Sequence, residues 1–361
     1  MTKQVNVTIN GKPIAVPENY TVVEAAKLAG IDIPVFCHHP KLEPVGMCRM
    51  CLVEVGQPMV DPKTKEVVME NGAPKIAMRP KLETACTNRV FEGMVVQTQT
   101  EKATVGQKST VEFLLTSHPL DCPVCDKGGE CPLQNLTMAH GPGKSRFIYD
   151  EKLKMDKQVP LGELIYLDRE RCIQCARCIR FQDEVAGEPV LAFDERGRTT
   201  QIVSLSDPGF DSIFSGNTTD ICPVGALTTA DFRFGARPWE LSAESSICTQ
   251  CPVGCNTTLN TRREAKAGGE IVVKRVMPRQ NEEVNEIWLC DKGRFAYHYA
   301  ESKERLTKPM IRKDGKLSRA SWDAATKLAA EKFTKNKKDF VVLASGRLSN
   351  EDLFNLKSLA D

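Results

Sequence analysis

Residues 171–178 read RCIQCARC, and the string CPVGAL begins at Cys222. The first string contains Cys172-x2-Cys175-x2-Cys178, which opens the run C-x2-C-x2-C-x3-C-P of proteins that bind two [4Fe–4S] clusters. In that pattern the last cysteine of each run completes the cluster of the other run. The spacing therefore predicts one cluster, with Cys222 supplying the fourth thiolate. These four cysteines are called the Cys172 set.

The ligands of a second cluster are missing from the same segment. The two-cluster pattern places them at position 182 and at positions 212, 215 and 218. Those positions hold Gln182, Ser212, Ser215 and Thr218. We interpret the segment as a two-cluster ferredoxin fold that has lost one cluster, which is a pattern that zinc binding does not explain.

The N-terminal segment carries the Cys37 set, which consists of Cys37, Cys48, Cys51 and Cys86. Plant-type [2Fe–2S] proteins have a C-x2-C pair followed by a distant fourth cysteine, and this set keeps both features with a wider first gap. We expect a [2Fe–2S] cluster here. Four thiolates also suit a structural zinc ion, so zinc remains the alternative for this set.

The secondary structure expected before this set is that of a small β-grasp domain. Residues 5–9 alternate apolar and polar side chains, Asn10-Gly11 supplies a hairpin turn, and residues 14–16 return. A capping box starting at Thr21 predicts a helix over residues 22–29.

The His118 set lies in the string HPLDCPVCDKGGECPLQ, which begins at His118. Cys122, Cys125 and Cys131 supply three thiolates, and a four-iron cluster needs a fourth ligand. His118 lies on the same loop and is the predicted ligand, whereas His140 is the weaker candidate. A neutral imidazole in place of a thiolate tends to raise the reduction potential.

Cys248, Cys251, Cys255 and Cys290 form the Cys248 set and account for the last of the fifteen cysteines. An odd count and clustered C-x2-C spacings favour metal ligation over disulfides or scattered buried thiols. Beyond this set we expect a helix over residues 321–332, a buried strand over 340–345 and a second helix from Glu351. Such an order is the first step of a doubly wound α/β domain.

Composition excludes several classes of function. The 361 residues carry 49 basic and 47 acidic side chains, a net charge of +2 that gives no footprint for nucleic acid. No stretch approaches the roughly 20 apolar residues of a membrane span, and the N-terminus lacks a secretory or organelle signal. We therefore expect membrane association only through partners. The sequence shows no convincing arrangement of a nucleophile or of general acid and base residues, so we predict no catalytic residues.

Taken together, these strings resemble the large iron–sulfur subunit of bacterial respiratory NADH:quinone oxidoreductase, complex I. The resemblance covers nearly the whole chain, including CTQCPVGC and CDKGR in the Cys248 set. It implies one [2Fe–2S] and three [4Fe–4S] clusters and no molybdenum cofactor. Family members are longer than this chain, because they continue into a molybdopterin-enzyme-like domain.

The resemblance also implies an α+β multi-domain architecture. It consists of a β-grasp [2Fe–2S] ferredoxin domain, a [4Fe–4S] domain with one His and three Cys ligands, a degenerate two-cluster ferredoxin-like domain, and the start of a molybdopterin-oxidoreductase-like α/β domain. The expected boundaries of these four domains are 1–98, 99–160, 161–240 and 241–361.

The implied function is electron relay from a flavin subunit that oxidises NADH toward quinone, coupled in the whole complex to proton translocation. The implied partners are the flavin/NADH-binding subunit, a small [2Fe–2S] subunit, and the ferredoxin-like and quinone-site subunits. The implied location is peripheral, on the cytoplasmic side of the inner (plasma) membrane.

Three alternatives remain. An NAD-linked formate dehydrogenase subunit should carry both four-iron clusters in its ferredoxin-like segment, and the diaphorase subunit of an NAD-reducing hydrogenase should stop before Cys248. A zinc-stabilised structural adaptor would have no redox function. Colour and EPR separate the last of these.

Overall fold

The computed structural model describes residues 3–70, 72–207, 209–336 and 340–361. Two compact units divide it, Met1–Trp239 and Glu240–Asp361, and both mix helices with strands as the sequence predicts. The finer division into four domains stays a prediction. In the described part of the chain, no helix combines the length and the apolar character that crossing a bilayer requires.

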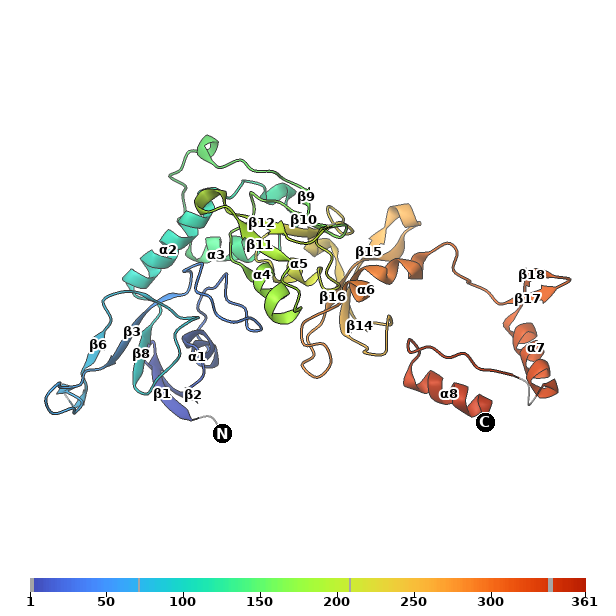
Figure 1. Cartoon of the computed structure of the whole chain (residues 1–361), viewed down its shortest axis with the longest axis horizontal. Helices are drawn as coiled ribbons and strands as arrows, with labels where there is room; N and C mark the ends of the chain where they lie inside the picture. Colours follow the sequence, from blue (N-terminus) through green and yellow to red (C-terminus); the bar gives the residue numbers. More distant parts are fainter. Residues whose placement is uncertain (1–2, 71, 208, 337–339) are drawn as a thin grey trace. The chain divides into compact units, whose positions relative to one another are not determined.

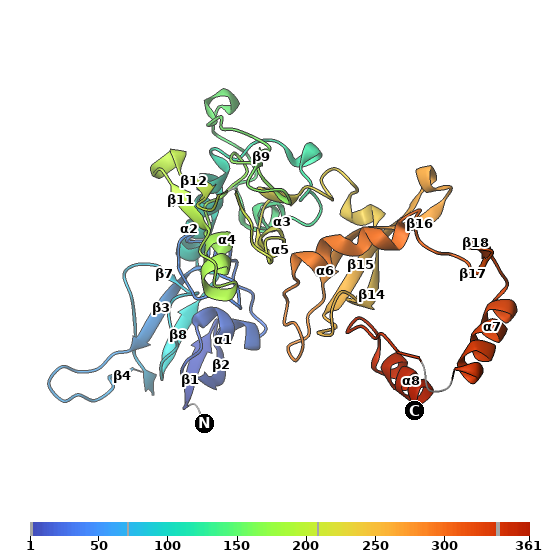
Figure 2. The ribbon, with the colours of Figure 1, turned by 45° about the vertical axis from the view of Figure 1, so that its right-hand side comes forward.

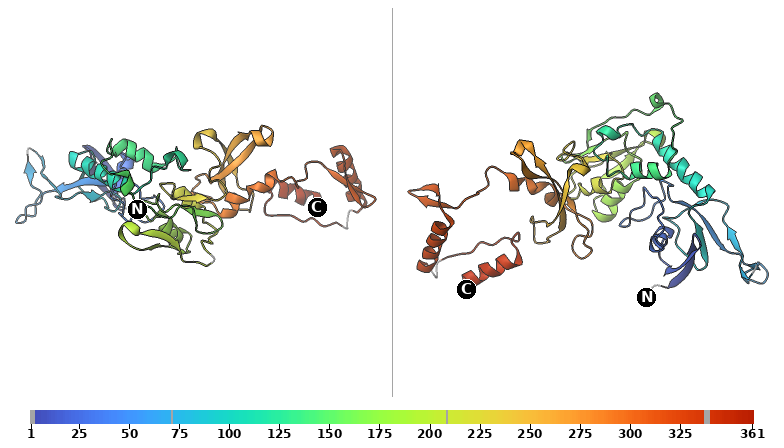
Figure 3. Two further views of the ribbon diagram at one scale, coloured as in Figure 1. Left: turned by 90° about the horizontal axis from the view of Figure 1, so that it is seen from above. Right: turned by 180° about the vertical axis from the view of Figure 1, so that it is seen from behind.

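The first unit begins with a sheet in the order β2-β1-β8-β3-β6, with β7 paired to β3. All pairs are antiparallel except β1 with β8, which is the parallel pair expected of a β-grasp. A small hairpin of β4 and β5 extends beyond β6 (Figure 3). The strands are β1 Gln4–Ile9, β2 Lys12–Pro17, β3 Leu52–Pro58, β4 Met69–Glu70, β5 Ala73–Pro74, β6 Ile76–Met78, β7 Glu83–Thr84 and β8 Met94–Gln97.

Helix α1, Val22–Leu28, lies beside this sheet (Figures 1 and 2). The predicted capping box is confirmed, because the Thr21 hydroxyl accepts from the Glu24 N–H while the Glu24 carboxylate accepts from the Thr21 N–H at 2.7 Å. The helix ends one residue before the predicted Ala29. Its buried side chains, Val22, Ala25 and Ala26, pack with the inward strand residues in one apolar core.

A second apolar core in the same unit joins segments that are far apart in sequence. It runs from Phe36 and Met50 in the loop after α1 to Leu133, Ile165 and Val224. Helix α2 contacts both β3 and α3 and so connects this core to the first sheet. The helices here are α2 Glu101–Leu115, η1 Cys122–Val124, α3 Pro132–His140 and η2 Tyr149–Glu151.

The rest of this unit consists of a three-stranded sheet in the order β13-β10-β9, a hairpin of β11 and β12, and short helices. Helix α4 continues directly into a π-helical turn, η3, and α5 precedes Cys222. The elements are β9 Val159–Pro160, β10 Ile165–Leu167, α4 Arg177–Arg180, η3 Phe181–Val185, β11 Leu191–Asp194, η4 Gly197–Thr199, β12 Gln201–Ser204, α5 Asn217–Ile221, β13 Leu227–Thr229 and η5 Pro238–Glu240.

The second unit is built on the antiparallel sheet β14-β15-β16, followed by a short helix that begins after Cys290. Farther along the chain come a hairpin and two helices. The elements are β14 Ser242–Ile247, β15 Asn256–Glu264, η6 Ala265–Ala267, β16 Glu270–Pro278, α6 Asp291–Phe295, η7 Ala296–Glu301, β17 Met310–Lys313, β18 Lys316–Arg319, α7 Trp322–Lys335 and α8 Asn350–Ala360.

The end of the chain confirms one prediction and contradicts another. Helices α7 and α8 occupy the predicted helical ranges to within a few residues. The predicted strand over residues 340–345 is wrong, since this segment has no regular structure, and Val341 and Leu343 are 85% and 92% exposed. A strand of a parallel sheet needs neighbouring strands for its backbone hydrogen bonds, and the described residues offer none beside this segment.

Candidate iron–sulfur sites

The Cys37 set gathers at one place. Cys37, Cys48 and Cys51 lie in the loop between α1 and β3, and Cys86 follows β7. Cys37 is within side-chain hydrogen-bond reach of Cys48 and Cys86, and Cys51 is within reach of Cys86. The thiols of Cys48 and Cys86 lower the pKa of Cys37 by donating to it. Four thiols therefore meet although the fourth comes from a distant segment.

The loop around this set is bent toward the sulfurs. The backbone N–H of Cys37 donates to the Cys48 sulfur at 3.4 Å, and that of Met50 donates to it at 3.5 Å. Arg49, between the two cysteines of the C-x2-C pair, has a φ of +59°. Left-handed backbone at a non-glycine residue costs about 1–3 kcal/mol and clusters at ligand-binding sites.

The His118 set corresponds to a cavity of about 470 Å³ in the first unit. All four side chains line this cavity, together with Arg171 and Gly225. Two of the cysteines, Cys125 and Cys131, are buried, whereas Cys122 is exposed. The cavity brings together the residues that spacing alone had grouped. The weaker candidate ligand, at the C-terminal end of α3, is not among the described residues lining it.

His118 is suited to act as a ligand. Its Nδ1 is buried and has no hydrogen-bond partner, which is uncommon for a buried polar atom. Burial, reinforced by the positive charges of Lys152 and Arg171, lowers the pKa of His118 to about 4. The imidazole is therefore neutral at pH 7 and has a lone pair to offer. These properties fit an iron ligand.

Glycines allow the backbone to approach this cavity closely. A Cβ on Gly225 would lie 2.2 Å from the Cys125 sulfur, so only glycine fits there. Gly129 has a φ of +94°, which its lack of a Cβ permits. The N–H of Gly128 donates to the Cys125 carbonyl, and that of Gly129 donates to the Gln134 side chain. The backbone N–H groups of Gly128 and Gly129 thus stabilise the turn by donating to oxygen atoms of the protein.

The Cys172 set also surrounds one place. Cys172, Cys175, Cys178 and Cys222 line one small apolar cavity. Burial raises the pKa of Cys172 to about 12 and that of Cys175 to about 11. Buried thiols at such a site are neutral unless a metal supplies compensating charge, because metal binding displaces their protons.

Backbone geometry supports a wrapped loop here as well. The N–H of Gln174 donates to the Cys172 sulfur at 3.4 Å. Gln174 and Ala176, on either side of Cys175, have φ angles of +54° and +58°. The C-x2-C loops of the Cys37 and Cys172 sets therefore share the same local strain.

The positions of the lost cluster are occupied by buried polar side chains. Gln182, Ser212, Ser215 and Thr218 are all buried. Both polar atoms of the Gln182 side chain are buried without a hydrogen-bond partner. Ser212 and Ser215 line a separate cavity of about 220 Å³. The structure thus keeps these positions in the interior although they lack thiols.

The Cys248 set is arranged around the start of α6. Cys248, Cys251 and Cys255 lie between β14 and β15, and the Cys290 sulfur accepts from the Gly293 N–H at 3.4 Å. Burial, together with the mutual repulsion of the four thiolates, raises the pKa values of Cys248 and Cys255. Among the described residues, no three His, Cys, Asp or Glu side chains form a group that fits a single metal ion.

Five family models match the chain in succession. They are "2Fe-2S iron-sulfur cluster binding domain" over residues 2–101, "NADH-ubiquinone oxidoreductase-G iron-sulfur binding region" over 107–146, "NADH-quinone oxidoreductase subunit 3, ferredoxin-like domain" over 162–228, "NADH-ubiquinone oxidoreductase NDSU1/NuoG-like, 4Fe-4S domain" over 243–298, and "Molybdopterin oxidoreductase" over 305–361.

Curated relatives match this chain over most or nearly all of its length. An NADH-quinone oxidoreductase subunit of Streptomyces coelicolor is 43% identical over 360 residues, which cover 99% of this chain and 39% of the relative. Subunit 3 of the Thermus thermophilus oxidoreductase is 44% identical over 334 residues, covering 89% of this chain and 41% of that one. The chain belongs to the family of NADH-quinone oxidoreductase iron–sulfur subunits. It spans about two fifths of the length of these relatives.

A solved structure resembles this member of the family over part of its length. It is a crystal structure of an NAD⁺-reducing [NiFe]-hydrogenase in the H2-reduced state, with 26% identity and a TM-score of 0.51. The match covers 64% of this chain and 90% of the hydrogenase chain. The family models agree with the predicted [2Fe–2S] domain, the [4Fe–4S] domains and the start of a molybdopterin-oxidoreductase-like domain.

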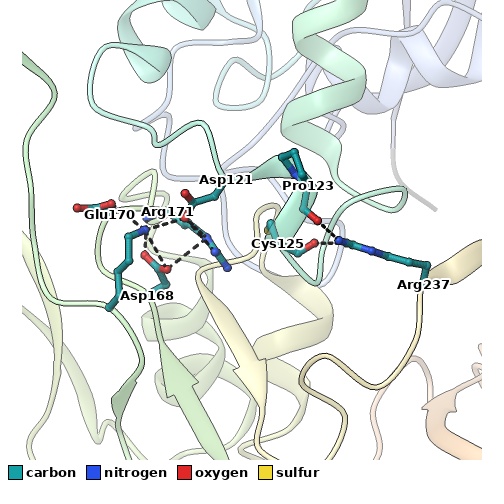
Figure 4. Close-up of polar contacts among 8 residues, drawn as sticks. Asp121, Pro123, Cys125, Asp168, Glu170, Arg171 and Arg237 are labelled. Atoms are coloured by element: carbon teal, nitrogen blue, oxygen red, sulfur yellow. Dashed lines mark hydrogen bonds and ion pairs between the residues drawn. The ribbon is translucent and has the colours of Figure 1, made fainter. Parts of the chain in front are cut away.

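Sequence reasoning missed a charged network (Figure 4). Two of its members, Asp121 and Arg171, line the His118 cavity. Arg171 contacts Asp121 at 2.9 Å and Asp168 at 3.2 Å. Lys157 contacts the same two carboxylates and also Glu170, at 2.7 Å. Two cations therefore lie among three carboxylates in a largely buried setting, which leaves the network one negative charge in excess. The sequence carries one signal of this network. Asp121 directly precedes Cys122, and Arg171 directly precedes Cys172, and each of these is the first cysteine of its set.

The His118 assignment leads to a direct prediction. Replacing His118 with cysteine should keep a cluster but lower its reduction potential, by on the order of 100 mV, because an anionic thiolate disfavours the added electron. An EPR redox titration measures the shift. His140→Ala is the matched control and should leave the potential unchanged. A His118→Cys variant with the wild-type potential would remove His118 from the ligand set.

Proposed function

We propose that this chain is an iron–sulfur electron-transfer subunit of NADH:quinone oxidoreductase, complex I. It would relay electrons from the flavin subunit toward quinone, coupled in the whole complex to proton translocation. The observation that carries the proposal is the cavity where a neutral His118, with an unpartnered Nδ1, meets three cysteines. Homology to NADH-quinone oxidoreductase subunits over nearly the full chain supports it.

We assign one [2Fe–2S] and three [4Fe–4S] clusters to the four sets, and no molybdenum cofactor. The convergence of the sets and the N–H groups directed at their sulfurs support this assignment. The proposed ligands of the [2Fe–2S] cluster are Cys37, Cys48, Cys51 and Cys86. The proposed ligands of the three [4Fe–4S] clusters are His118, Cys122, Cys125 and Cys131 for the first; Cys172, Cys175, Cys178 and Cys222 for the second; and Cys248, Cys251, Cys255 and Cys290 for the third.

The chain itself contributes ligation, spacing and electrostatics. When bound, each cluster accepts and releases single electrons. The residues set how readily this happens, through ligand charge, N–H donation to sulfur, and burial. Arg171, held by Asp121 and Asp168, fixes a positive charge beside the His118 cavity. Electron transfer needs no general acid or base, so we assign the chain no catalytic residue.

The proposed partners rest on the resemblance to the complex I subunit, and homology to NADH-quinone oxidoreductase subunits supports membership of such a complex. They are the flavin/NADH-binding subunit, a small [2Fe–2S] subunit, and the ferredoxin-like and quinone-site subunits of the complex. The proposed location is peripheral, on the cytoplasmic side of the plasma membrane. The partners would supply the attachment to that membrane.

Reduction by NADH tests the proposed function. NADH should bleach the visible absorbance of the anaerobic chain only when the flavin-bearing subunit is present, since iron–sulfur clusters accept single electrons and not hydride. Dithionite should bleach it in either case. Failure of the flavin-bearing subunit to mediate reduction, with dithionite still effective, would contradict the assignment to complex I while leaving the clusters in place.

One alternative has specific support, a diaphorase subunit of an NAD-reducing hydrogenase. The solved hydrogenase chain resembles this one in fold and sequence. Against it, the match leaves about a third of this chain uncovered, and the Cys248 set carries a separate 4Fe-4S family match at residues 243–298. The formate dehydrogenase alternative is disfavoured by Gln182, Ser212, Ser215 and Thr218. A zinc adaptor is tested by metal analysis.

A further inference from the structure

Arg177 connects the Cys37 and Cys172 sets. It begins α4, beside the loop that follows α1 (Figure 2). One guanidinium nitrogen, Nη1, donates to the Ile221 carbonyl at 3.0 Å, directly before Cys222. The other, Nη2, donates to the His38 carbonyl, directly after Cys37. One side chain therefore holds the backbone beside a ligand of each set.

The positive charge of the Arg177 guanidinium also interacts with cysteines of both sets. Arg177 lines the cavity of the Cys172 set and lies within electrostatic range of Cys175, Cys222 and Cys37. Its Nε is buried without a hydrogen-bond partner, so that one donor is not committed to the protein. The two sets are neighbours, because Cys37 and Cys175 themselves interact electrostatically and share one apolar core.

A neighbouring arginine provides an internal comparison. Arg180, one turn along α4, donates to the carbonyls of Cys37 and Glu43. Arg180 is thus hydrogen-bonded to the loop of the Cys37 set, whereas Arg177 is hydrogen-bonded to the loops of both sets. The two residues share their charge and their helix, and they differ in the segments that they connect.

We propose that Arg177 is a positioning residue that raises the reduction potentials of the clusters at the Cys37 and Cys172 sets together. Each cluster gains one negative charge when it takes up an electron, as one Fe³⁺ becomes Fe²⁺. A fixed cation between the two sites stabilises both reduced forms, and arginine keeps its charge at any working pH. The fork geometry also holds the two ligand loops at a constant separation. The inference rests on the proposed cluster assignments.

The test is an EPR redox titration of the full chain, purified anaerobically, with Arg177→Gln, Arg177→Lys and Arg180→Gln. We expect Arg177→Gln to lower the reduced-to-oxidised ratio of both clusters about tenfold at fixed potential, which equals about 59 mV for one electron. Arg177→Lys, which keeps the charge, should stay within about threefold of wild type. Arg180→Gln should shift the cluster at the Cys37 set and leave the cluster at the Cys172 set unchanged.

Each outcome supports or overturns the role of Arg177. Unchanged potentials in Arg177→Gln, a shift of only one cluster, or a tenfold shift in Arg177→Lys at full iron content would each overturn the proposal. If Arg177→Gln loses iron from both clusters while Arg177→Lys and Arg180→Gln retain it, the proposal is supported, and loss from one cluster alone contradicts it. A wild-type chain without the two EPR signals would instead refute the proposed function.

Discussion

Replacing Cys222 with alanine should remove one entire [4Fe–4S] cluster. Cys222 lines the same cavity as Cys172, Cys175 and Cys178 and follows them by more than 40 residues in sequence. The eleven cysteines outside the Cys172 set belong to the other three sets, so no spare thiolate is available to replace Cys222. We expect the iron content to fall from about 14 to about 10 per chain, with loss of one four-iron EPR signal.

Thr218→Ala is the matched control for this experiment. Thr218 lies one turn earlier on α5, is buried, and occupies a position where a two-cluster ferredoxin would have a cysteine. Its hydroxyl donates a hydrogen bond to the Ser215 carbonyl. Thr218→Ala therefore disturbs the local packing of α5 as Cys222→Ala does, but it removes no proposed ligand. This variant should keep all of its iron. A Cys222→Ala chain with full iron content, or an equal loss in Thr218→Ala, would contradict the assignment of the Cys172 set.

Replacing Arg171 with methionine should destabilise the first unit strongly. The Arg171 and Asp168 side chains are only 9% and 8% exposed, and Asp121 is a second partner of the arginine. Removing one member of a buried ion pair costs about 3–5 kcal/mol, because its partner remains buried without compensation. Lys157 still contacts Asp121 and Asp168, so we expect the lower end, about 3 kcal/mol.

Thermal unfolding followed by circular dichroism measures this loss. In a unit of this size, about 3 kcal/mol corresponds to a midpoint about 6–12 °C lower. Arg146→Met is the control, since Arg146 forms a well-aligned pair with Glu112 but its side chain is 76% exposed. Exposed pairs contribute at most about 1 kcal/mol. Equal midpoints for the two variants would mean that the Arg171 network does not stabilise the fold.

Local signals in the sequence predicted local features well. The capping box at Thr21, the N-terminal hairpin and helices α7 and α8 each depend on residues a few positions apart, and each is confirmed. Cysteine spacing grouped side chains that the structure brings together, since most members of a set are close in sequence, and their role as ligands stays a prediction. The distant Cys222 was predictable because a known pattern fixes its place.

Features that depend on tertiary context escaped prediction. The sequence marks Arg171 and Arg177 only by their position directly before a cysteine of the Cys172 set, and it does not reveal which distant groups each arginine contacts. The sequence shows that Gln182 stands where a ligand cysteine is missing. It does not show that the Gln182 amide is buried without a hydrogen-bond partner. The predicted strand over residues 340–345 is wrong because an apolar, β-branched run becomes a strand only beside others.

Metal and sulfide analysis of the anaerobically purified chain, combined with EPR, tests the central claim most directly. Two irons from one [2Fe–2S] cluster and four from each of three [4Fe–4S] clusters predict about 14 irons, about 14 acid-labile sulfides and no stoichiometric zinc. Reduction with dithionite should then give EPR signals of both cluster types. Zinc bound at these thiolates, without sulfide and without an EPR signal on reduction, would contradict the account.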